Sequence, residues 1–333
     1  MGRIAMPVRR AVFVAALSRA LAGCSDRQSA LAPHAAEAQH LFWLIFTFVV
    51  LLGAIWLIVM IALAIAMWRR RAECQQPHER TANALISICA GLTGLIVIGL
   101  TVVSFAGQRE MQRRESPLLV RIIGHQWWWE LRYAEDVPNR PFVTANELHL
   151  PAGRDVVLNL ESSDVIHSFW APSLAGKKDL IPGRVNELNI RAPQAGVYRA
   201  QCAEFCGLQH AHMGLDVVVE TPDRFEAWRI GQAGPGRAPQ TEEQRFGQDV
   251  FFTRACFACH AIRGTKADGF VGPDLTHFAS RRTLAAALLP RTRGATAGWI
   301  ADPQGLKPGA HMPLLPLSSQ ELNAVVAYLE NLE

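Results

Sequence analysis

Two long runs of residues without a charge lie in the first third of the chain. The first covers residues 41–68 and the second covers residues 84–106. As α-helices they would be about 42 Å and about 35 Å long, whereas the hydrocarbon core of a membrane is about 30 Å thick. The pattern therefore predicts a two-helix transmembrane hairpin within residues 24–116.

After Pro117 the apolar residues fall into short runs rich in β-branched and aromatic side chains, separated by Pro and Gly. Short runs with such breaks between them indicate strands. The expected strands cover residues 119–123, 127–133, 147–150, 156–160, 185–190, 197–201 and 215–220. This pattern is typical of an all-β sandwich or barrel with antiparallel pairing, which we place at residues 117–230.

The last part of the chain changes to helical spacing. Residues 231–240 are rich in Gly, Pro and Ala and predict a linker. Amphipathic patterns at residues 243–252 and 319–332 then predict helices. We expect residues 241–333 to form a third, all-α domain.

Composition and charge narrow the function classes. The chain has 333 residues and a net charge of +4, with 50% hydrophobic and 19% charged residues. This apolar content excludes a disordered chain, and charges along most of the length exclude a polytopic transporter. Residues 1–116 hold 12 Arg against 6 acidic residues, whereas the later domains have no basic excess. Nucleic-acid binding needs a basic face, so we predict no nucleic-acid partner.

The first 23 residues have the pattern of an export signal, with three Arg before a short apolar stretch at residues 11–17. Residues 21–24, Leu-Ala-Gly-Cys, resemble the bacterial lipobox, so Cys24 is a candidate lipid anchor. A plain signal peptide with an incidental Cys is the alternative. Four Arg between the two apolar runs favour a cytoplasmic loop. Residues 117–333 would then lie on the outer, periplasmic side of a bacterial inner membrane.

Metal-ligand residue types gather in the middle domain. Cys202, Cys206, His210 and Met213 follow one another at spacings of four, four and three, and His167 lies 35 residues before Cys202. Thiolate, imidazole and thioether form a soft ligand set that selects copper. One blue-copper centre would use a single Cys, so the second Cys is unexplained by a single copper. Two coppers, bridged by the two thiolates and each bound by one imidazole, would use all of these ligands. The alternatives are a disulfide and a thioredoxin-like copper chaperone, which lacks the following His and Met.

A second motif lies in the C-terminal domain. Residues 256–260 are Cys-Phe-Ala-Cys-His, the attachment signature of c-type haem. Cys256 and Cys259 would form the thioethers, and His260 would supply the proximal nitrogen. Met312 is the candidate for the distal side, with the adjacent His311 as its rival. Zinc binding is the alternative, although no second Cys pair or paired His follows.

The copper motif resembles the binuclear CuA site of the cytochrome c oxidase subunit II family. The matching segments are Cys-x-Glu-x-Cys-Gly-x-x-His-x-x-Met at 202–213, Asp-Val-Ile-His-Ser at 164–168, Gly-His-Gln-Trp-Trp-Trp-Glu at 124–130 and Leu-Ile-Pro-Gly-Arg at 180–184. With the two apolar runs, the resemblance covers about residues 40–230. It implies a cupredoxin-like Greek-key barrel for the middle domain.

The resemblance also implies residue roles. The implied copper ligands are His167 and His210, one for each copper; Cys202 and Cys206, which bridge the pair; and two weak ligands, Met213 and the backbone carbonyl of Glu204. The Glu204 side chain would reach Mg²⁺ or Mn²⁺ at the interface with subunit I. Trp127 matches the aromatic residue of electron entry, and Asp164 would orient an imidazole ligand.

The C-terminal domain resembles a class I cytochrome c over nearly all of residues 241–333, with Met312 as the sixth ligand. His/Met ligation raises the haem potential, which suits donation to a high-potential acceptor. A CuA domain fused to a cytochrome c resembles subunit II of a caa-type terminal oxidase.

This resemblance implies that the chain is a subunit of the enzyme cytochrome-c oxidase. It would pass electrons from the fused c haem through CuA to the haem of subunit I, where oxygen is reduced to water with proton pumping. The implied partners are subunits I and III and, as donor, cytochrome c or a quinol–cytochrome c reductase. The alternatives are an electron-transfer subunit of another membrane reductase, such as nitric oxide reductase, and a copper-delivery assembly protein.

Overall fold

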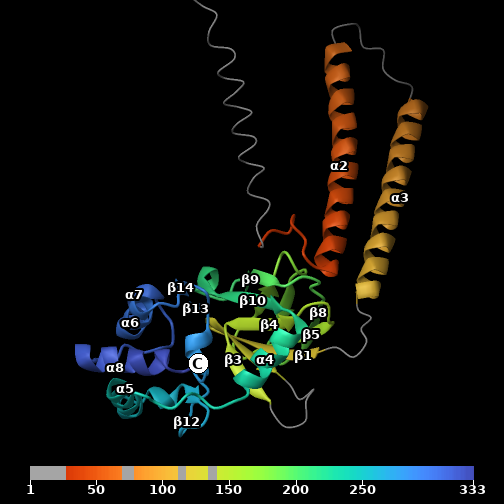
Figure 1. The fold of residues 1–333 in the computed structure, drawn as a ribbon. Helices are drawn as coiled ribbons and strands as arrows, with labels where there is room; N and C mark the ends of the chain where they lie inside the picture. The colour runs from red at the N-terminus through yellow and green to blue at the C-terminus, as the bar shows by residue number, and fades with distance from the viewer. Residues whose placement is uncertain (1–27, 70–78, 112–117, 134–140) are drawn as a thin grey trace, which may run out of the picture. The chain divides into compact units, whose positions relative to one another are not determined.

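The computed structural model describes residues 28–69, 79–111, 118–133 and 141–333 (Figure 1). The predicted signal peptide at residues 1–23 and the candidate lipid anchor Cys24 lie outside the described residues. The chain divides into two compact units. One comprises Met1–Ala38 with Ser116–Glu333, and the other comprises Gln39–Glu115.

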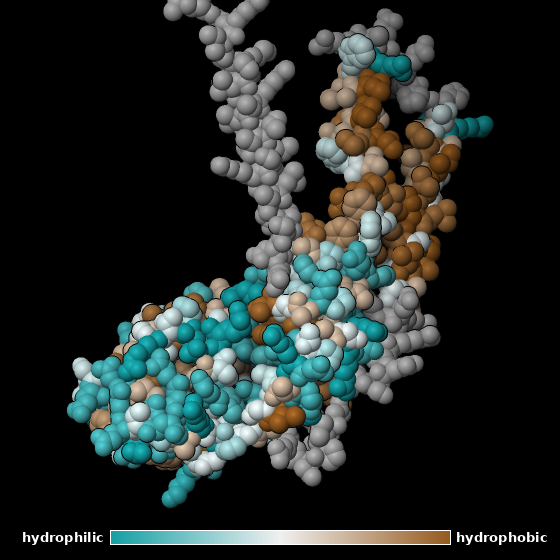
Figure 2. Space-filling model, viewed as in Figure 1, coloured by the Kyte–Doolittle hydropathy of each residue, from teal (hydrophilic) through white to brown (hydrophobic). Residues whose placement is uncertain are grey.

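Two long apolar helices, α2 (Ala36–Arg69) and α3 (Glu79–Met111), contain the predicted spans. No residue in the most apolar stretch of either helix is buried, and Figure 2 shows their surfaces as largely hydrophobic. A helix that is hydrophobic all round needs an apolar environment. By length and composition both helices can cross a membrane. The prediction of two apolar helices near the N-terminus is confirmed.

The middle of the chain forms two five-stranded sheets with the orders β3-β2-β1-β5-β8 and β4-β10-β9-β6-β7. The strands are β1 (Leu118–His125), β2 (Trp128–Tyr133), β3 (Phe142–Ala145), β4 (Glu147–Pro151), β5 (Val156–Ser162), β6 (His167–Trp170), β7 (Lys178–Leu180), β8 (Asn186–Ile190), β9 (Gly196–Cys202) and β10 (Gly214–Glu220). In β1, Val120 and Ile122 are buried while Arg121 is exposed, because successive side chains point to opposite faces. One core cluster contains residues of both sheets, which confirms the β-rich cupredoxin-like domain.

Strand pairing differs from the antiparallel expectation at two places. β1 pairs with β5, and β4 pairs with β10, in parallel. A parallel pair needs a long crossover connection, so it joins segments that are distant in sequence. The strands β3, β6 and β7 lie outside the predicted runs, because three or four residues are too few to display an alternating pattern.

The C-terminal domain consists of helices around a second core cluster. The helices are α5 (Glu242–Thr253), α6 (Arg293–Ala301), α7 (Pro303–Leu306) and α8 (Ser319–Glu330), and α4 (Pro222–Gln232) precedes the domain. Thr241 and Ser318 each begin a helix with a capping box. A Cβ at Gly247 of α5 would collide with the Ala324 carbonyl of α8, so glycine permits this close crossing. The predicted helical domain is confirmed.

Short elements complete this domain. They are the ladders β11 (Ala261–Ile262) with β12 (Ala267–Asp268) and β13 (Thr283–Leu284) with β14 (Leu289–Pro290), and the 3₁₀ turns η2 (Cys256–Ala258) and η3 (Phe278–Ser280). The sandwich and the helical domain belong to the same compact unit. Hydrogen bonds join the two domains, for example from Gln209 Nε2 to the Pro308 carbonyl at 2.7 Å.

Candidate copper and haem sites

The copper-ligand residues meet where β9 ends and β10 begins. Cys202 is the last residue of β9, and Met213 directly precedes β10. The Cys202 amide donates to the Met213 carbonyl at 2.9 Å, which closes the loop between them. β6 pairs with β9 with Phe169 opposite Cys202. This pairing brings His167, at the start of β6, to the loop although it is 35 residues away in sequence.

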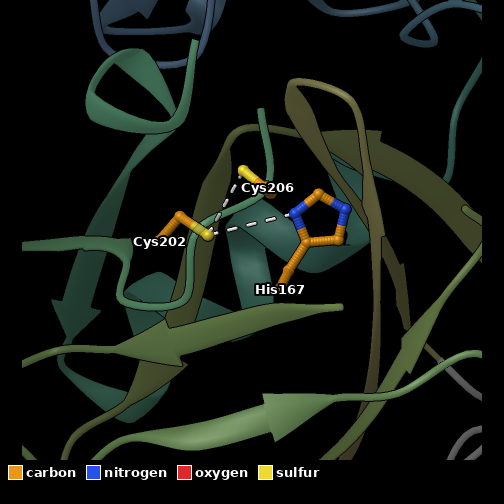
Figure 3. A group of neighbouring side chains, drawn as sticks. All are labelled: His167, Cys202 and Cys206. Carbon is orange, nitrogen blue, oxygen red and sulfur yellow. Dashed lines mark hydrogen bonds between the residues drawn. The ribbon is translucent and has the colours of Figure 1, made fainter. Parts of the chain in front are cut away.

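The two thiols and two imidazoles form a short chain of contacts. The sulfur atoms of Cys202 and Cys206 lie 3.8 Å apart. His167 Nδ1 lies 3.9 Å from the Cys202 sulfur, and His210 Nδ1 lies 3.7 Å from the Cys206 sulfur. Figure 3 shows the side chains of His167, Cys202 and Cys206 converging; His167 begins β6, Cys202 ends β9 and Cys206 lies in the loop after it. Both cysteines are free, so the alternative of a disulfide is not what the structure contains.

Two weaker donors complete the group. Met213 Sδ lies 4.0 Å from the Cys206 sulfur, and the Glu204 carbonyl oxygen lies 3.2 Å from the Cys202 sulfur. The Glu204 carboxylate instead lies 3.6 Å from Lys177 Nζ and is 45% exposed. The backbone of Glu204 therefore faces the site while its side chain faces outward. Sulfur and imidazole donors in a buried cluster are the donor set that copper prefers, so these residues fit a copper pair.

Asp164 fixes the orientation of His167. Its Oδ1 accepts the His167 Nε2–H at 2.8 Å, so Nδ1 is free to face the sulfur. Asp164 also accepts the backbone N–H groups of Gln126 and Val165, both at 2.7 Å. Burial alone would raise the pKa of Asp164, but the hydrogen bonds from His167 and the backbone lower it. A charged carboxylate thus supports the ligand ring.

The proximity of the two thiols shifts their pKa values in opposite directions. The hydrogen bond with Cys206 is the largest cause that lowers the pKa of the Cys202 thiol, to about 3. The same hydrogen bond raises the pKa of Cys206. Burial alone would lower the pKa of His167, but its hydrogen bonds to Asp164 and Cys202 raise it. A lowered thiol pKa favours the thiolate, which is the form of cysteine that binds metal ions.

Trp127 lies against the loop between β9 and β10, residues 203–213, which we call the copper loop. Its indole Nε1–H donates to the Cys206 carbonyl at 3.0 Å, and Gln126 Nε2 donates to the same oxygen at 2.7 Å. Gly207 has a φ of +112°, and a Cβ there would lie 3.0 Å from the Trp127 ring. Glycine is therefore needed both for the backbone conformation and for the close approach.

The haem-motif residues gather at η2. Cys256 and Cys259 are free and half-buried, and His260 Nδ1 donates to the Pro273 carbonyl at 2.7 Å. Burial lowers the pKa of His260, which favours the neutral ring that binds a metal. Its Nε2 is left as the ligand nitrogen. These residues fit a covalently attached c-type haem.

The structure separates the two rivals for the distal side. Met312 packs against the core cluster of the helical domain. His311 is exposed, and its ring centroid lies 6.2 Å from that of Trp127. Met312 as the sixth haem ligand stays a prediction. Among the described residues, His167, Cys202 and Cys206 are the only group of three or more His, Cys, Asp or Glu side chains whose ligand atoms all lie within 4.8 Å of one another.

Sequence reasoning missed one residue beside the site. Lys307 is 2% exposed, and its Nζ contacts the carbonyls of Trp127, His212 and Ala285. Burial lowers the pKa of Lys307 to about 7. Lysines are almost never fully buried without partners. The only sequence signal is its place five residues before Met312.

Comparisons with known proteins agree with the two sites. The profile of the family described as cytochrome c oxidase subunit II, periplasmic domain, matches residues 137–221, and that of cytochrome c matches residues 245–333. Cytochrome c oxidase subunit 2 of Alkalihalophilus pseudofirmus is 29% identical over 94% of this chain and 94% of its own length. The Bacillus subtilis protein of the same name is 30% identical over 67% of this chain and 64% of its own length. The solved periplasmic domain of cytochrome oxidase subunit II from Bradyrhizobium japonicum matches 37% of this chain and 96% of its own, with 28% identity and a TM-score of 0.34.

Proposed function

Because this chain belongs to the cytochrome c oxidase subunit II family, we propose that it is the electron-entry subunit of a haem-copper terminal oxidase. In this proposal the chain passes electrons from its own haem domain, through a binuclear copper site, to the haem of subunit I. Reduction of oxygen to water, coupled to proton pumping, takes place in subunit I. The observation that carries the proposal is the unbroken series of contacts from His167 through Cys202 and Cys206 to His210.

The proposed ligands divide into two sets. For the copper pair they are His167, His210, Cys202, Cys206, Met213 and the Glu204 carbonyl; for the haem they are Cys256, Cys259, His260 and Met312. When bound, the copper pair and the haem accept and release single electrons. The chain fixes their surroundings: Asp164 orients one imidazole, and the buried thiols, which are at most 5% exposed, exclude water. Excluding water and fixing the ligands lowers the reorganisation energy of electron transfer, because fewer atoms move when a bound metal gains or loses an electron.

Trp127 is the proposed residue of electron entry. Its indole is hydrogen-bonded to the Cys206 carbonyl, and its ring lies beside His311 of the haem domain. It thus contacts both the copper loop and the segment that leads to Met312. Aromatic contact between the two sites supports this role.

The proposed setting is a bacterial inner membrane, with residues 117–333 on the periplasmic side and a lipid anchor at Cys24. The domain division proposed is 24–116, 117–230, a linker at 231–240, and 241–333. Subunits I and III are the proposed partners, and cytochrome c or a quinol–cytochrome c reductase is the proposed donor. The exposed Glu204 carboxylate supports a Mg²⁺ or Mn²⁺ site at the subunit I interface.

The proposal is tested on the complex purified from membranes with the full chain. We expect electron paramagnetic resonance to show a binuclear copper signal. The complex should take up oxygen when a reduced donor is supplied, and subunit I should co-purify with the chain. Cys206→Ser should abolish the binuclear signal, whereas Cys89→Ser, at an exposed free cysteine of α3, should leave it unchanged. A single labile copper would indicate a copper-delivery protein, and nitric oxide reduction without oxygen uptake would indicate another reductase.

A further inference from the structure

A segment of the haem domain, residues 307–311, lies directly on the copper loop and Trp127. Gln209 Nε2 of the copper loop donates to the Pro308 carbonyl at 2.7 Å. At Gly309, φ is +83°, and a Cβ there would lie 3.2 Å from Leu208 Cδ1 and 3.6 Å from the Trp127 ring. Trp127 is only 8% exposed. The haem domain therefore covers the residue proposed for electron entry.

Lys307 connects the pieces of this contact. Its Nζ lies 2.8 Å from the Trp127 carbonyl, 2.8 Å from the His212 carbonyl and 2.9 Å from the Ala285 carbonyl. An ammonium group has three N–H donors, so each carbonyl can receive one. Two of the acceptors belong to the sandwich and one to the haem domain. A buried cation shared in this way fixes the distance between the two domains.

The acceptor in the haem domain lies on an unusual turn. Ala285, Ala286 and Ala287 have φ values of 54°, 63° and 59°, in the left-handed region that non-glycine residues rarely adopt. The Ala286 carbonyl accepts the Gly214 amide at 2.9 Å, and the Ala287 carbonyl accepts Arg199 Nη1 at 3.3 Å. The turn thus presents three successive carbonyls, one to Lys307 and two to the sandwich.

Further contacts extend the interface beyond this turn. The Arg282 amide donates to Glu147 Oε2 at 2.9 Å, and Arg263 Nη1 donates to the Val143 carbonyl at 3.0 Å. These bonds join β3 and β4 of the sandwich to the haem domain. Because they lie apart from the copper loop, the haem domain is held at more than one point and cannot pivot about Lys307 alone.

We propose that the haem domain is a permanently docked electron donor to the copper site and that Lys307 is the residue that positions it. Residues 307–311 cover Trp127, so soluble donor proteins cannot contact it. This rests on the proposed function, in which Trp127 is the residue of electron entry. A soluble donor protein would then lose one electron to the haem iron, which is reduced by one electron, and it would not reach the copper site directly. Residue Lys307 controls the second transfer, from haem to copper, and has no part in the first.

The test uses the full chain in the purified complex, with Lys307→Met and, as a matched control, Lys266→Met at an exposed lysine of the same domain. In Lys307→Met we expect hydrogen exchange to become at least tenfold faster in peptides that cover residues 126–129 and 207–213. Rapid mixing with reduced soluble cytochrome c should show unchanged haem reduction and at least tenfold slower haem-to-copper transfer. The haem spectrum and Lys266→Met should be unchanged.

Unchanged exchange and unchanged haem-to-copper transfer in Lys307→Met would overturn the proposal. If that variant does not assemble, Gln209→Ala removes the Pro308 contact from the copper side and should speed exchange in the same peptides; no acceleration there would also overturn it. A wild-type complex without a binuclear copper signal would instead refute the proposed function. The two failures are therefore distinguishable.

Discussion

The contact between Asp164 and His167 yields a quantitative prediction for the copper site. Asp164→Ala removes the acceptor of the His167 Nε2–H at 2.8 Å and two backbone hydrogen bonds that hold Gln126 and Val165. The imidazole can then rotate, and its Nδ1 no longer faces the Cys202 sulfur. Groups that orient a metal-binding histidine typically contribute about 10–100-fold to metal affinity, which is about 1.4–2.7 kcal/mol. This range agrees with about 1.5–3 kcal/mol for a hydrogen bond to a charged group.

Asp164→Asn separates charge from geometry. The amide oxygen can still accept the His167 proton, but a neutral acceptor makes a bond roughly half as strong. We therefore expect Asp164→Ala to bind copper up to about 100-fold more weakly than the wild type, and Asp164→Asn about tenfold more weakly. Glu187→Gln, at an exposed carboxylate of β8, removes one charge from the sheet that does not contain β6, β9 and β10, and it should bind copper as the wild type does.

The assay is competition with a copper chelator, followed by the intensity of the binuclear paramagnetic resonance signal in the purified complex. Circular dichroism and thermal unfolding without copper check that the variants fold. If Asp164→Ala retains copper within about twofold of the wild type, the reasoning is refuted, because the hydrogen bond would then have no part in orienting His167.

Three further predictions concern other parts of the chain. His149 is buried between Glu147 and Glu220 at 2.9 and 3.0 Å; burial alone would lower its pKa, but these bonds raise it. Stability from this group is therefore fully present below pH about 6.5 and is lost as pH rises through the raised value, so thermal melts of the wild type should fall more between pH 6 and 9 than those of His149→Gln. Met312→Ala should lower the haem potential in a redox titration and change the haem spectrum; no change would mean that another residue occupies the sixth position. Ala255 is exposed with a φ of 58°, so Ala255→Gly should stabilise the chain by up to about 1 kcal/mol in denaturant titrations, and destabilisation would contradict the reasoning.

Local features of the fold could be predicted from the sequence. The two uncharged runs are long enough to indicate helices by composition alone, and they lie inside α2 and α3. Helix α8 begins at Ser319 after the N-cap Ser318, as the predicted helix from residue 319 requires. These helices are determined by residues that are close together in the chain, so the local sequence is enough to predict them.

Short strands and their partners could not be predicted in this way. β6 has only four residues, yet its pairing with β9 brings His167 to Cys202. The parallel pairing of β4 with β10 joins segments that are more than 60 residues apart. Pairing of this kind is decided by which faces bury most apolar surface in the whole domain. No local pattern in the sequence indicates which strands will pair.

The spacing within residues 202–213 and within residues 256–260 predicted most of the copper and haem ligands, because each segment places several ligand types within one loop or turn. His167 joins the copper ligands only through the pairing of β6 with β9. The environment of those motifs was decided by tertiary structure. Lysine is a residue type that is usually exposed, but the contact between the two domains buries Lys307 among three carbonyls. His149, which had no predicted role, is placed between two carboxylates by strands β4 and β10. Spacing specifies which donors can meet, whereas burial and long-range hydrogen bonding decide how they are oriented and which surfaces remain accessible.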